Sequence, residues 1–340
     1  MLSFKESKIH NRDGFNLTDD GGDLDETLDQ ASYCIYCHKQ ERDSCSRGLH
    51  DKDGGIKINP LGEELNGCPL DEKISEMNEL KANGLLITPL AVAIIDNPML
   101  AATGHRICND CMKSCIYQKQ DPVNIPKIET HTLRDVLDLP WGFEIYSLLT
   151  RWNPLNLETP YPKDDTGKKV LVVGMGPAGF TLAHYLLNQG HIVVGIDGLK
   201  IEPLVSGLAD QAFKPIKDIK VLYEELEHRK SYGFGGVTEY GITVRWDKNF
   251  LTIIRMLLER RNNFNLFGGI RFGGNLEWRQ AFDLGFDHIA LAIGAGRPNL
   301  LDVPHSVALG VRTASDFLMS LQLSGAARNN SITSLQIRLP

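Results

Sequence analysis

The sequence predicts an α/β protein that begins with an all-α domain, and three observations carry this prediction. From Lys168 onward the pattern runs strand, glycine turn, helix and strand, which is typical of a parallel α/β sheet. Before that point, short helical patterns such as 70–83 accompany seven cysteines, all within the first 115 residues. Hydrophobic residues make up 42% of the 340 residues, which is enough to form a buried core.

Composition divides the chain into four segments. Residues 1–30 are acidic and contain glycine, so we expect a flexible acidic tail. Residues 31–135 form the cysteine-rich helical domain, and 136–167 form a connector that carries several prolines and two tryptophans. Residues 168–340 form the α/β domain.

Charge and hydropathy exclude several classes of protein. The 36 Lys and Arg residues against 43 Asp and Glu residues give a net charge of −7, which argues against a nucleic-acid binder. The longest nearly apolar stretch, 84–95, is shorter than the roughly 20 residues that a bilayer span needs. Residues 1–14 lack the apolar centre of a secretion signal. We therefore predict a cytoplasmic protein with no membrane span.

The glycine turn at the start of the α/β domain matches a dinucleotide-binding fingerprint. In this pattern Gly174 permits the tight turn, Gly176 lets the backbone approach a pyrophosphate, and Gly179 lets helix and strand pack closely. Pro177 and Ala178 complete this turn, and the N-terminus of the helix that follows offers N–H groups and a dipole that favour phosphate.

The flanking elements strengthen this interpretation. Strand 169–173 precedes the turn, helical composition follows over 180–188, and a second strand over 191–196 ends at Asp197. Asp197 lies 23 residues after Gly174, near the position of the acid that binds ribose hydroxyls. An isolated glycine turn would be weak evidence, but the ordered combination favours a dinucleotide site.

Two later glycine elements bear on which dinucleotide binds. The apolar strand 286–293 leads into Gly294 and Ala295, as in flavoproteins that close over their FAD, although an ordinary strand-to-loop turn is the alternative. Gly235 and Gly236 belong to a second glycine-rich loop that could pass an isoalloxazine ring or be a plain surface loop.

The cysteines are candidate metal ligands. Their number is odd, they are clustered, and no secretion signal precedes them, so ligation is favoured over disulfides, with ordinary reduced thiols as the remaining alternative. They are Cys34, Cys37, Cys45, Cys68, Cys108, Cys111 and Cys115.

Spacing favours iron–sulfur clusters over zinc. The last three cysteines are at i, i+3 and i+7, which on a helix is one face. Seven thiols complete two four-ligand clusters only if one other side chain joins them. A zinc site could use the two CxxC pairs that start at Cys34 and Cys108, but these are about 70 residues apart, against the usual roughly 15–20, and three cysteines would be left over.

In ordered combination, these motifs resemble the small (beta) subunit of bacterial glutamate synthase and the matching N-terminal part of dihydropyrimidine dehydrogenase. The matching motifs are the two-part cysteine pattern, Asp96-Asn97-Pro98, Gly104-His105-Arg106-Ile107-Cys108, Pro122-Val123-Asn124-Ile125, Gly174–Gly179, Gly235-Gly236, Tyr240-Gly241-Ile242, Asp247-Lys248 and Ala292-Ile293-Gly294-Ala295.

The resemblance implies a helical ferredoxin-like domain with two 4Fe–4S clusters, followed by a Rossmann-like FAD-binding domain. Glu129 would supply the non-cysteine ligand, although a solvated acid near a helix start is the alternative. The wide gap between Cys37 and Cys45 and the insertion at 51–55 depart from the family, which leaves the assignment of Cys45 and Cys68 open. The implied ligand sets are Cys34, Cys37, Cys45 and Cys115 for one cluster, and Cys68, Cys108, Cys111 and Glu129 for the other.

The family passes hydride from NADPH to FAD and then single electrons through the clusters to a partner. After Gly179 we find no second fingerprint, and the family's C-terminal segment that closes over FAD is missing too. We therefore expect the front half of a longer flavoprotein, with the NADPH site, the terminal acceptor, or both on another chain or domain. The alternatives are a non-catalytic remnant and a zinc-stapled interaction module. The charged residues at 255–261 are expected to form a solvated helix face.

Overall fold

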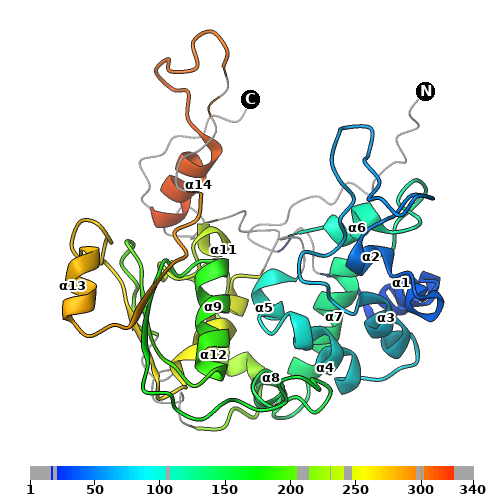
Figure 1. The fold of residues 1–340 in the computed structure, drawn as a ribbon, viewed down its shortest axis with the longest axis horizontal. Helices are drawn as coiled ribbons and strands as arrows, with labels where there is room; N and C mark the ends of the chain where they lie inside the picture. Colours follow the sequence, from blue (N-terminus) through cyan, green and yellow to red (C-terminus); the bar gives the residue numbers. More distant parts are fainter. Residues whose placement is uncertain are drawn as a thin grey trace.

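The structure is a computed structural model that describes residues 17, 21–104, 108–204, 214–229, 231–240, 247–295, 300 and 302–324. Helices α1 to α8 gather on one side of the molecule, and a small sheet flanked by helices lies on the other (Figure 1). No helix within these described ranges is long and apolar enough to cross a membrane. Most of the predicted tail and the motif residues 105–107, 241–242 and 296–298 lie outside the described residues.

The first half of the chain is helical, as the short periodic patterns predict. Its longest helix, α7, begins after Asn124, whose side chain accepts the Lys127 N–H, and carries a proline in its first turn. The elements are α1 (Leu24–Tyr33), the 3-10 helix η1 (Cys37–Gln40), α2 (Ser44–Arg47), α3 (Ile74–Ala82), α4 (Ile87–Asp96), α5 (Leu100–Thr103), α6 (Asp110–Ser114), α7 (Ile125–Leu137) and α8 (Gly142–Leu149).

Helix α1 begins inside the stretch that the sequence predicts to be a flexible tail. The Asp23 side chain accepts the Glu26 N–H at 2.8 Å and so caps the helix. Glu26 pairs with Lys127 of α7 at 2.8 Å, and Thr27 is fully buried. Capping and contact with α7 therefore order residues whose composition alone indicated disorder.

The second half of the chain forms a four-stranded, fully parallel sheet. Its order is β3-β2-β1-β4, so the first strand of the fingerprint lies in the centre. The predicted mixed α/β class with a parallel sheet is confirmed at this level. The strands are β1 (Lys169–Val173), β2 (Ile192–Ile196), β3 (Phe264–Phe267) and β4 (His288–Leu291).

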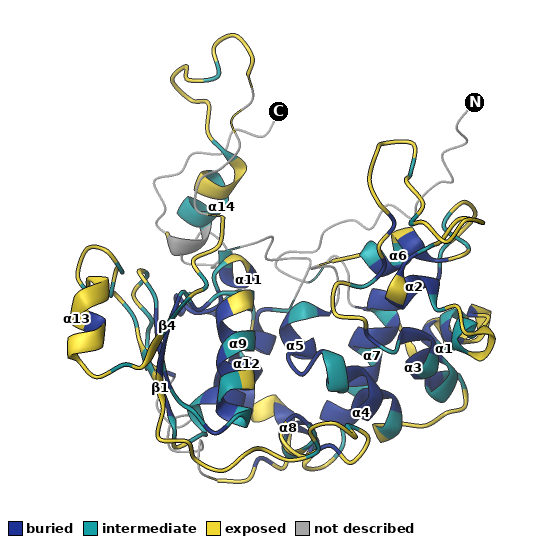
Figure 2. Cartoon of the chain, viewed as in Figure 1, coloured by how far each residue is buried: buried dark blue, intermediate teal, exposed yellow. Residues whose placement is uncertain are grey.

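Helices cover the two faces of the sheet unequally. The helices α9 (Pro177–Asn188) and α12 (Asn249–Glu259) lie between the sheet and the helical half, and most of their residues are buried or partly buried (Figure 2). The short helix α13 (Trp278–Asp283) lies on the other side and is largely exposed. The remaining elements are η2 (Ile219–Leu222), α11 (Val237–Tyr240) and α14 (Ala314–Leu323).

One apolar core runs from the helical half through α9 and α12 to the sheet. The predicted connector takes part in it, because α8 buries Phe143 and Tyr146 completely. The Tyr146 hydroxyl donates to the Pro98 carbonyl at 2.8 Å, and Glu144 pairs with Arg260 at 2.8 Å. Helix α8 thus packs between the two halves, whereas most of residues 154–167 are exposed.

Candidate functional site

Four cysteines from different elements line one cavity, which we call site 1. Cys34 ends α1, Cys37 begins η1, Cys45 lies in α2 and Cys115 ends α6. Three of these side chains are buried and Cys37 is partly buried. The rest of the lining is mostly apolar, with Asn78 among it.

Burial shapes the chemistry of the site 1 thiols. It raises the pKa of Cys37 to about 11, with the neighbouring Cys34 as the next cause. It also raises the pKa of Cys45 far above its ordinary value, and Asp43 adds to this. The Cys45 thiol lies 3.0 Å from an Asp43 carboxylate oxygen. Thiols with raised pKa values favour the protonated form, and a metal ligand must give up that proton.

The other three cysteines gather with Glu129 into a second group, which we call site 2. Burial raises the pKa of Cys111 well above its ordinary value, and Glu129, Cys68 and Cys108 raise it further, in that order. Glu129 is only 8% exposed, so the alternative of a solvated helix-start acid is wrong. Burial raises the pKa of Glu129 strongly, and the nearby Glu72 adds to this.

Helix α6 divides the last three cysteines between the two sites. It spans only Asp110–Ser114, so the expectation that Cys108, Cys111 and Cys115 share one helix face is wrong. Cys108 precedes the helix. Cys115 ends it, because the Cys115 N–H donates to the Met112 carbonyl and the backbone of Cys115 is extended. The two CxxC pairs of the zinc alternative fall into different sites.

The two sites adjoin each other. The Cys68 N–H donates to the Cys45 carbonyl at 2.8 Å, and Cys111 and Cys115 are one helical turn apart. Four thiols at site 1, and three thiols with a buried carboxyl at site 2, are donor sets that suit iron–sulfur clusters. The residues present therefore fit the implied groups.

The fold itself requires two of the fingerprint glycines. Gly174 has φ +95°, and a Cβ there would lie 2.4 Å from the Ala292 carbonyl oxygen. A Cβ on Gly179 would lie 1.8 Å from the Gly174 carbonyl oxygen. At Gly176 the nearest atom to a Cβ would be the Gly236 Cα at 3.7 Å, so chain packing alone does not demand glycine there.

The turn presents backbone N–H groups at the start of α9. Pro177 and Ala178 are its first residues, and no side chain caps it. The Asp197 carboxylate accepts the Met175 and Leu199 N–H groups, both at 2.9 Å. Asp197 thereby holds the turn against the end of β2.

The later glycine elements meet the fingerprint turn. The Gly235 N–H donates to the Met175 carbonyl at 3.1 Å, and a Cβ on Gly236 would lie 3.0 Å from the Gly176 Cα. Gly294 has φ +69°, and a Cβ there would meet no atom within 4 Å. Ala295 follows it. These elements lie at the carboxyl ends of β1 and β4, the edge where parallel α/β sheets bind ligands.

The sequence interpretation missed a buried ionic group beside the second glycine loop. Arg229 pairs through two 2.9 Å hydrogen bonds with Glu239 of α11, and both side chains are almost fully buried. Lys248 donates to the Thr238 carbonyl at 2.6 Å, and burial lowers its pKa to about 8. No motif connects residues 229, 239 and 248, so only the fold brings them together.

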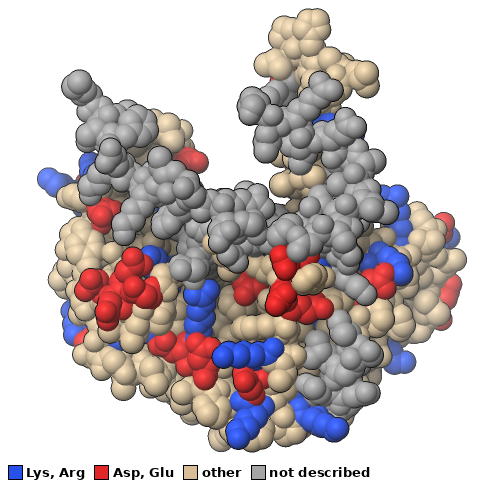
Figure 3. All heavy atoms as spheres, turned by 180° about the vertical axis from the view of Figure 1, so that it is seen from behind, with Lys and Arg blue, Asp and Glu red and all other residues tan. Residues whose placement is uncertain are grey.

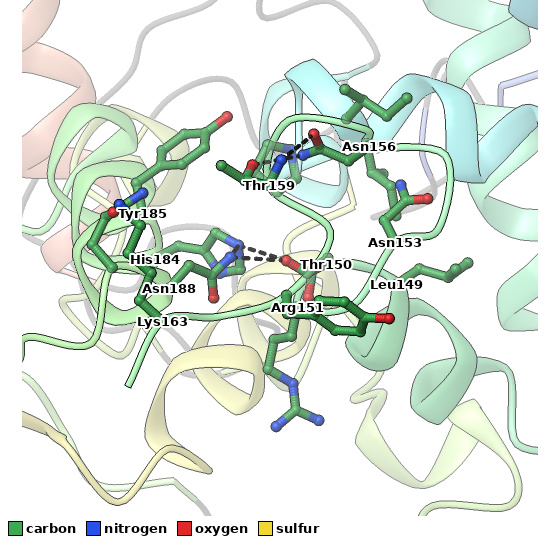
Figure 4. A pocket seen from close by; sticks show the side chains of 15 residues that line it. Leu149, Thr150, Arg151, Asn153, Asn156, Thr159, Lys163, His184, Tyr185 and Asn188 are labelled. Carbon is green, nitrogen blue, oxygen red and sulfur yellow. Dashed lines mark hydrogen bonds between the residues drawn. The ribbon is translucent and has the colours of Figure 1, made fainter. Parts of the chain in front are cut away.

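One cavity contains none of the predicted ligands. It lies between α4, α8, the following loop and α9 (Figure 4). The buried His184 donates from Nε2 to the Thr150 carbonyl at 3.0 Å, and burial lowers its pKa to about 3.

On the face shown in Figure 3, acidic and basic side chains are interspersed.

Comparison with known proteins points to one group. No protein-family model matches the chain. It is 57% identical over 242 residues to an uncharacterized protein of Rickettsia prowazekii, covering 71% of this chain and 34% of that protein. The glutamate synthase (NADPH) small chain of Bacillus subtilis is 29% identical over 289 residues, covering 82% of this chain and 48% of that one. The glutamate synthase (NADPH) small chain of Mycobacterium tuberculosis is 27% identical over 256 residues, covering 74% of this chain and 42% of that one.

The chain is a distant relative of glutamate synthase small chains. This supports the resemblance that its motifs indicated. The chain spans between about a third and about half of the length of these relatives.

Proposed function

We propose that this chain is an electron-transfer oxidoreductase subunit that binds FAD at the fingerprint turn and two 4Fe–4S clusters at sites 1 and 2. The observation that carries the proposal is the pair of adjoining four-donor sites packed on the same core as a dinucleotide turn. The distant relationship to glutamate synthase small chains supports it.

The dinucleotide turn suits a pyrophosphate. The uncapped start of α9 offers N–H groups and a positive dipole end to the phosphates, and Gly176 leaves room for them. Asp197 fixes the turn and retains lone pairs for a ribose hydroxyl. Gly235 and Gly236 on one side, and Gly294 and Ala295 on the other, would border the bound FAD.

The cysteines and Glu129 would hold the clusters. When bound, FAD converts hydride into single electrons and the clusters relay them. The thiols would lose their protons on loading, and the four buried ones, Cys34, Cys45, Cys111 and Cys115, would shield the bound groups from water. Helix α6 fixes the spacing of the two sites, because Cys111 and Cys115 belong to different ligand sets.

A partner completes the proposed reaction. The described residues contain one dinucleotide turn, and the relatives are named as small chains. We propose that another chain or domain carries the NADPH site, the terminal electron acceptor, or both.

Metal and flavin analysis tests the proposal. Anaerobically purified protein should contain about eight irons per chain, as two cubanes, together with FAD. Cys37→Ala and Cys111→Ala should each remove about four irons, from site 1 and site 2 respectively. The matched control Met112→Leu should keep all of them. Stoichiometric zinc, two or fewer irons, or tight NADPH binding without flavin would contradict the proposal.

Reaction with NADPH tests the role of the partner. Hydride transfer needs the nicotinamide carbon held about 3–3.5 Å from the flavin. In a stopped-flow experiment with the 340-residue chain alone, we expect NADPH to bleach the flavin absorbance only slowly. Dithionite should bleach it completely. Fast, saturable bleaching by NADPH would place the nicotinamide site within this chain.

A further inference from the structure

The loop between Cys37 and Cys45 carries two of the four site 1 thiols at its ends. The residues that flank η1 at its start, Tyr36 and Glu41, have left-handed backbones with φ +52° and +56°, although neither is glycine. Such conformations are costly for residues other than glycine and persist only where neighbouring contacts hold them. Contacts from outside the loop are therefore expected to fix its shape.

The side chain of Ser75, on α3, makes such contacts at both ends of the loop. Its hydroxyl oxygen accepts the His38 backbone N–H at 3.2 Å, directly after Cys37. The same hydroxyl donates to Asp43 Oδ2 at 3.0 Å, two residues before Cys45. Ser75 is fully buried, so water does not compete for these hydrogen bonds.

The contacts continue on either side of the serine. His38 Nδ1 lies 2.8 Å from the Ser75 oxygen, and His38 Nε2 lies 3.2 Å from a carboxylate oxygen of Glu79, one turn further along α3. On the other side, Asp43 Oδ1 lies 3.0 Å from the Cys45 Sγ. One buried hydroxyl thus links α3, which carries none of the cysteines, to the segments that place two of them.

We propose that Ser75 is a positioning residue for site 1, and that its hydroxyl sets the separation of Cys37 and Cys45 by binding the chain next to each of them. This role rests on the proposed function. It accounts for the way in which two cysteines with seven residues between them reach one cavity. The ligands of site 2 lie outside this loop, so the role is specific to site 1.

Site-selective loss of iron tests this role. Groups that orient metal ligands usually change metal affinity by about 10- to 100-fold, so Ser75→Ala should release about four of its irons to a chelator about 10- to 100-fold faster than unmodified protein. The cluster that remains should give the electron paramagnetic resonance spectrum of Cys37→Ala, which is expected to keep site 2 alone.

The matched control is Thr132→Val. Thr132 is also fully buried in the helical half, but its hydroxyl has no hydrogen-bond partner among the described residues. Replacing that hydroxyl with a methyl group keeps the shape of the side chain. This variant should therefore release iron from both sites at the rate of unmodified protein.

A metal-free measurement tests the contact itself. In Ser75→Ala the His38 amide loses its acceptor, so its hydrogen exchange should become about 3- to 10-fold faster, in line with the net value of one hydrogen bond. Thr132→Val should leave the exchange rate of that amide unchanged.

Several results would overturn the role. Equal iron release from Ser75→Ala and unmodified protein would exclude it. Loss of both clusters at one rate would mean that the hydroxyl supports the whole fold rather than site 1. Unchanged exchange at His38 would show that Ser75 does not hold the loop. Unmodified protein without iron would instead reject the proposed function, and exchange at His38 would still decide whether Ser75 holds the loop.

Discussion

Gly174 is a residue whose identity the backbone fixes. Its φ of +95° lies in the left-handed region, and the Ala292 carbonyl leaves no room for a side chain. Sequence and structure agree here because the constraint is local: a sharp turn between strand and helix needs this conformation wherever it occurs.

At this position we expect Gly174→Ala to destabilise the protein by on the order of 2 kcal/mol or more, since strained backbone conformations cost of order 1–3 kcal/mol before any clash. Gly198→Ala is the matched control, because a Cβ at Gly198 would meet no atom within 4 Å and its φ is not in the left-handed region. Urea unfolding at neutral pH measures both. Equal midpoints for the two variants would contradict the prediction.

His184 gives a pH-dependent prediction. The folded state keeps its ring neutral down to about pH 3, whereas the unfolded chain takes up a proton near its ordinary pKa of 6.5. The unfolded state therefore binds more protons between these values, and stability falls as the pH drops below 6.5. At pH 5 the loss is about 2 kcal/mol.

The variant His184→Gln should lack this acid sensitivity while keeping a donor for the Thr150 carbonyl. Comparing urea midpoints at about pH 7.5 and about pH 5.0, on either side of the ordinary histidine pKa, isolates the contribution of the ring. An identical loss in the variant and the unmodified protein would assign the acid sensitivity to other groups.

At the scale of elements, the short length of α6 determines which cysteines lie together. The sequence spacing of the last three cysteines suits one helix face, but α6 is only five residues long. Its ends place Cys108 at site 2 and Cys115 at site 1. The charged residues of α12 show a similar difference: Arg255 is buried and donates to the Glu202 carbonyl at 2.9 Å, so the expected solvated face is wrong there.

The buried pair of Arg229 and Glu239 anchors α11 beside the second glycine loop. We expect Arg229→Met to cost about 3–5 kcal/mol, because it removes the guanidinium that balances the charge of a buried carboxylate. Adding Glu239→Gln should recover much of that loss. Thermal and urea unfolding of the two single variants and the double variant measure the coupling, and independent effects would show that the pair is not coupled.

At the scale of the whole molecule, the two halves share one core. Apolar side chains continue from the helices around the cysteines into α9 and α12, and Glu144 of α8 binds Arg260 and the Ile216 N–H. The proposed flavin and cluster sites would therefore belong to one packed unit.

This shared core predicts joint unfolding. Trp152 follows α8, which contacts both halves, and stacks on Tyr161, and Trp278 begins α13 on the far side of the sheet. Variants that retain only one of these tryptophans should show the same urea midpoint by fluorescence, because separate unfolding would expose the apolar face that the halves share. Two distinct midpoints would show that the halves unfold independently.

Features that depend on neighbouring residues could be predicted from the sequence. Strand β1, the fingerprint turn, helix α9 and strand β2 follow from local pattern and from the conformation that glycine alone adopts readily. The number and clustering of the cysteines can also be read along the chain without knowledge of any distant contact, and the metal ligation that they indicate stays a prediction.

Which distant groups meet could not be predicted in this way, because it depends on tertiary packing. The grouping of the cysteines into two sites was implied by the family resemblance and not by spacing, and the burial of Glu129 beside Glu72 and of Arg229 against Glu239 joins residues from separate elements. These contacts arise when helices pack and exclude water, and packing depends on the whole set of buried surfaces rather than on spacing along the chain. Helix α1 is ordered for the same reason, because its acidic sequence folds where α7 supplies Lys127.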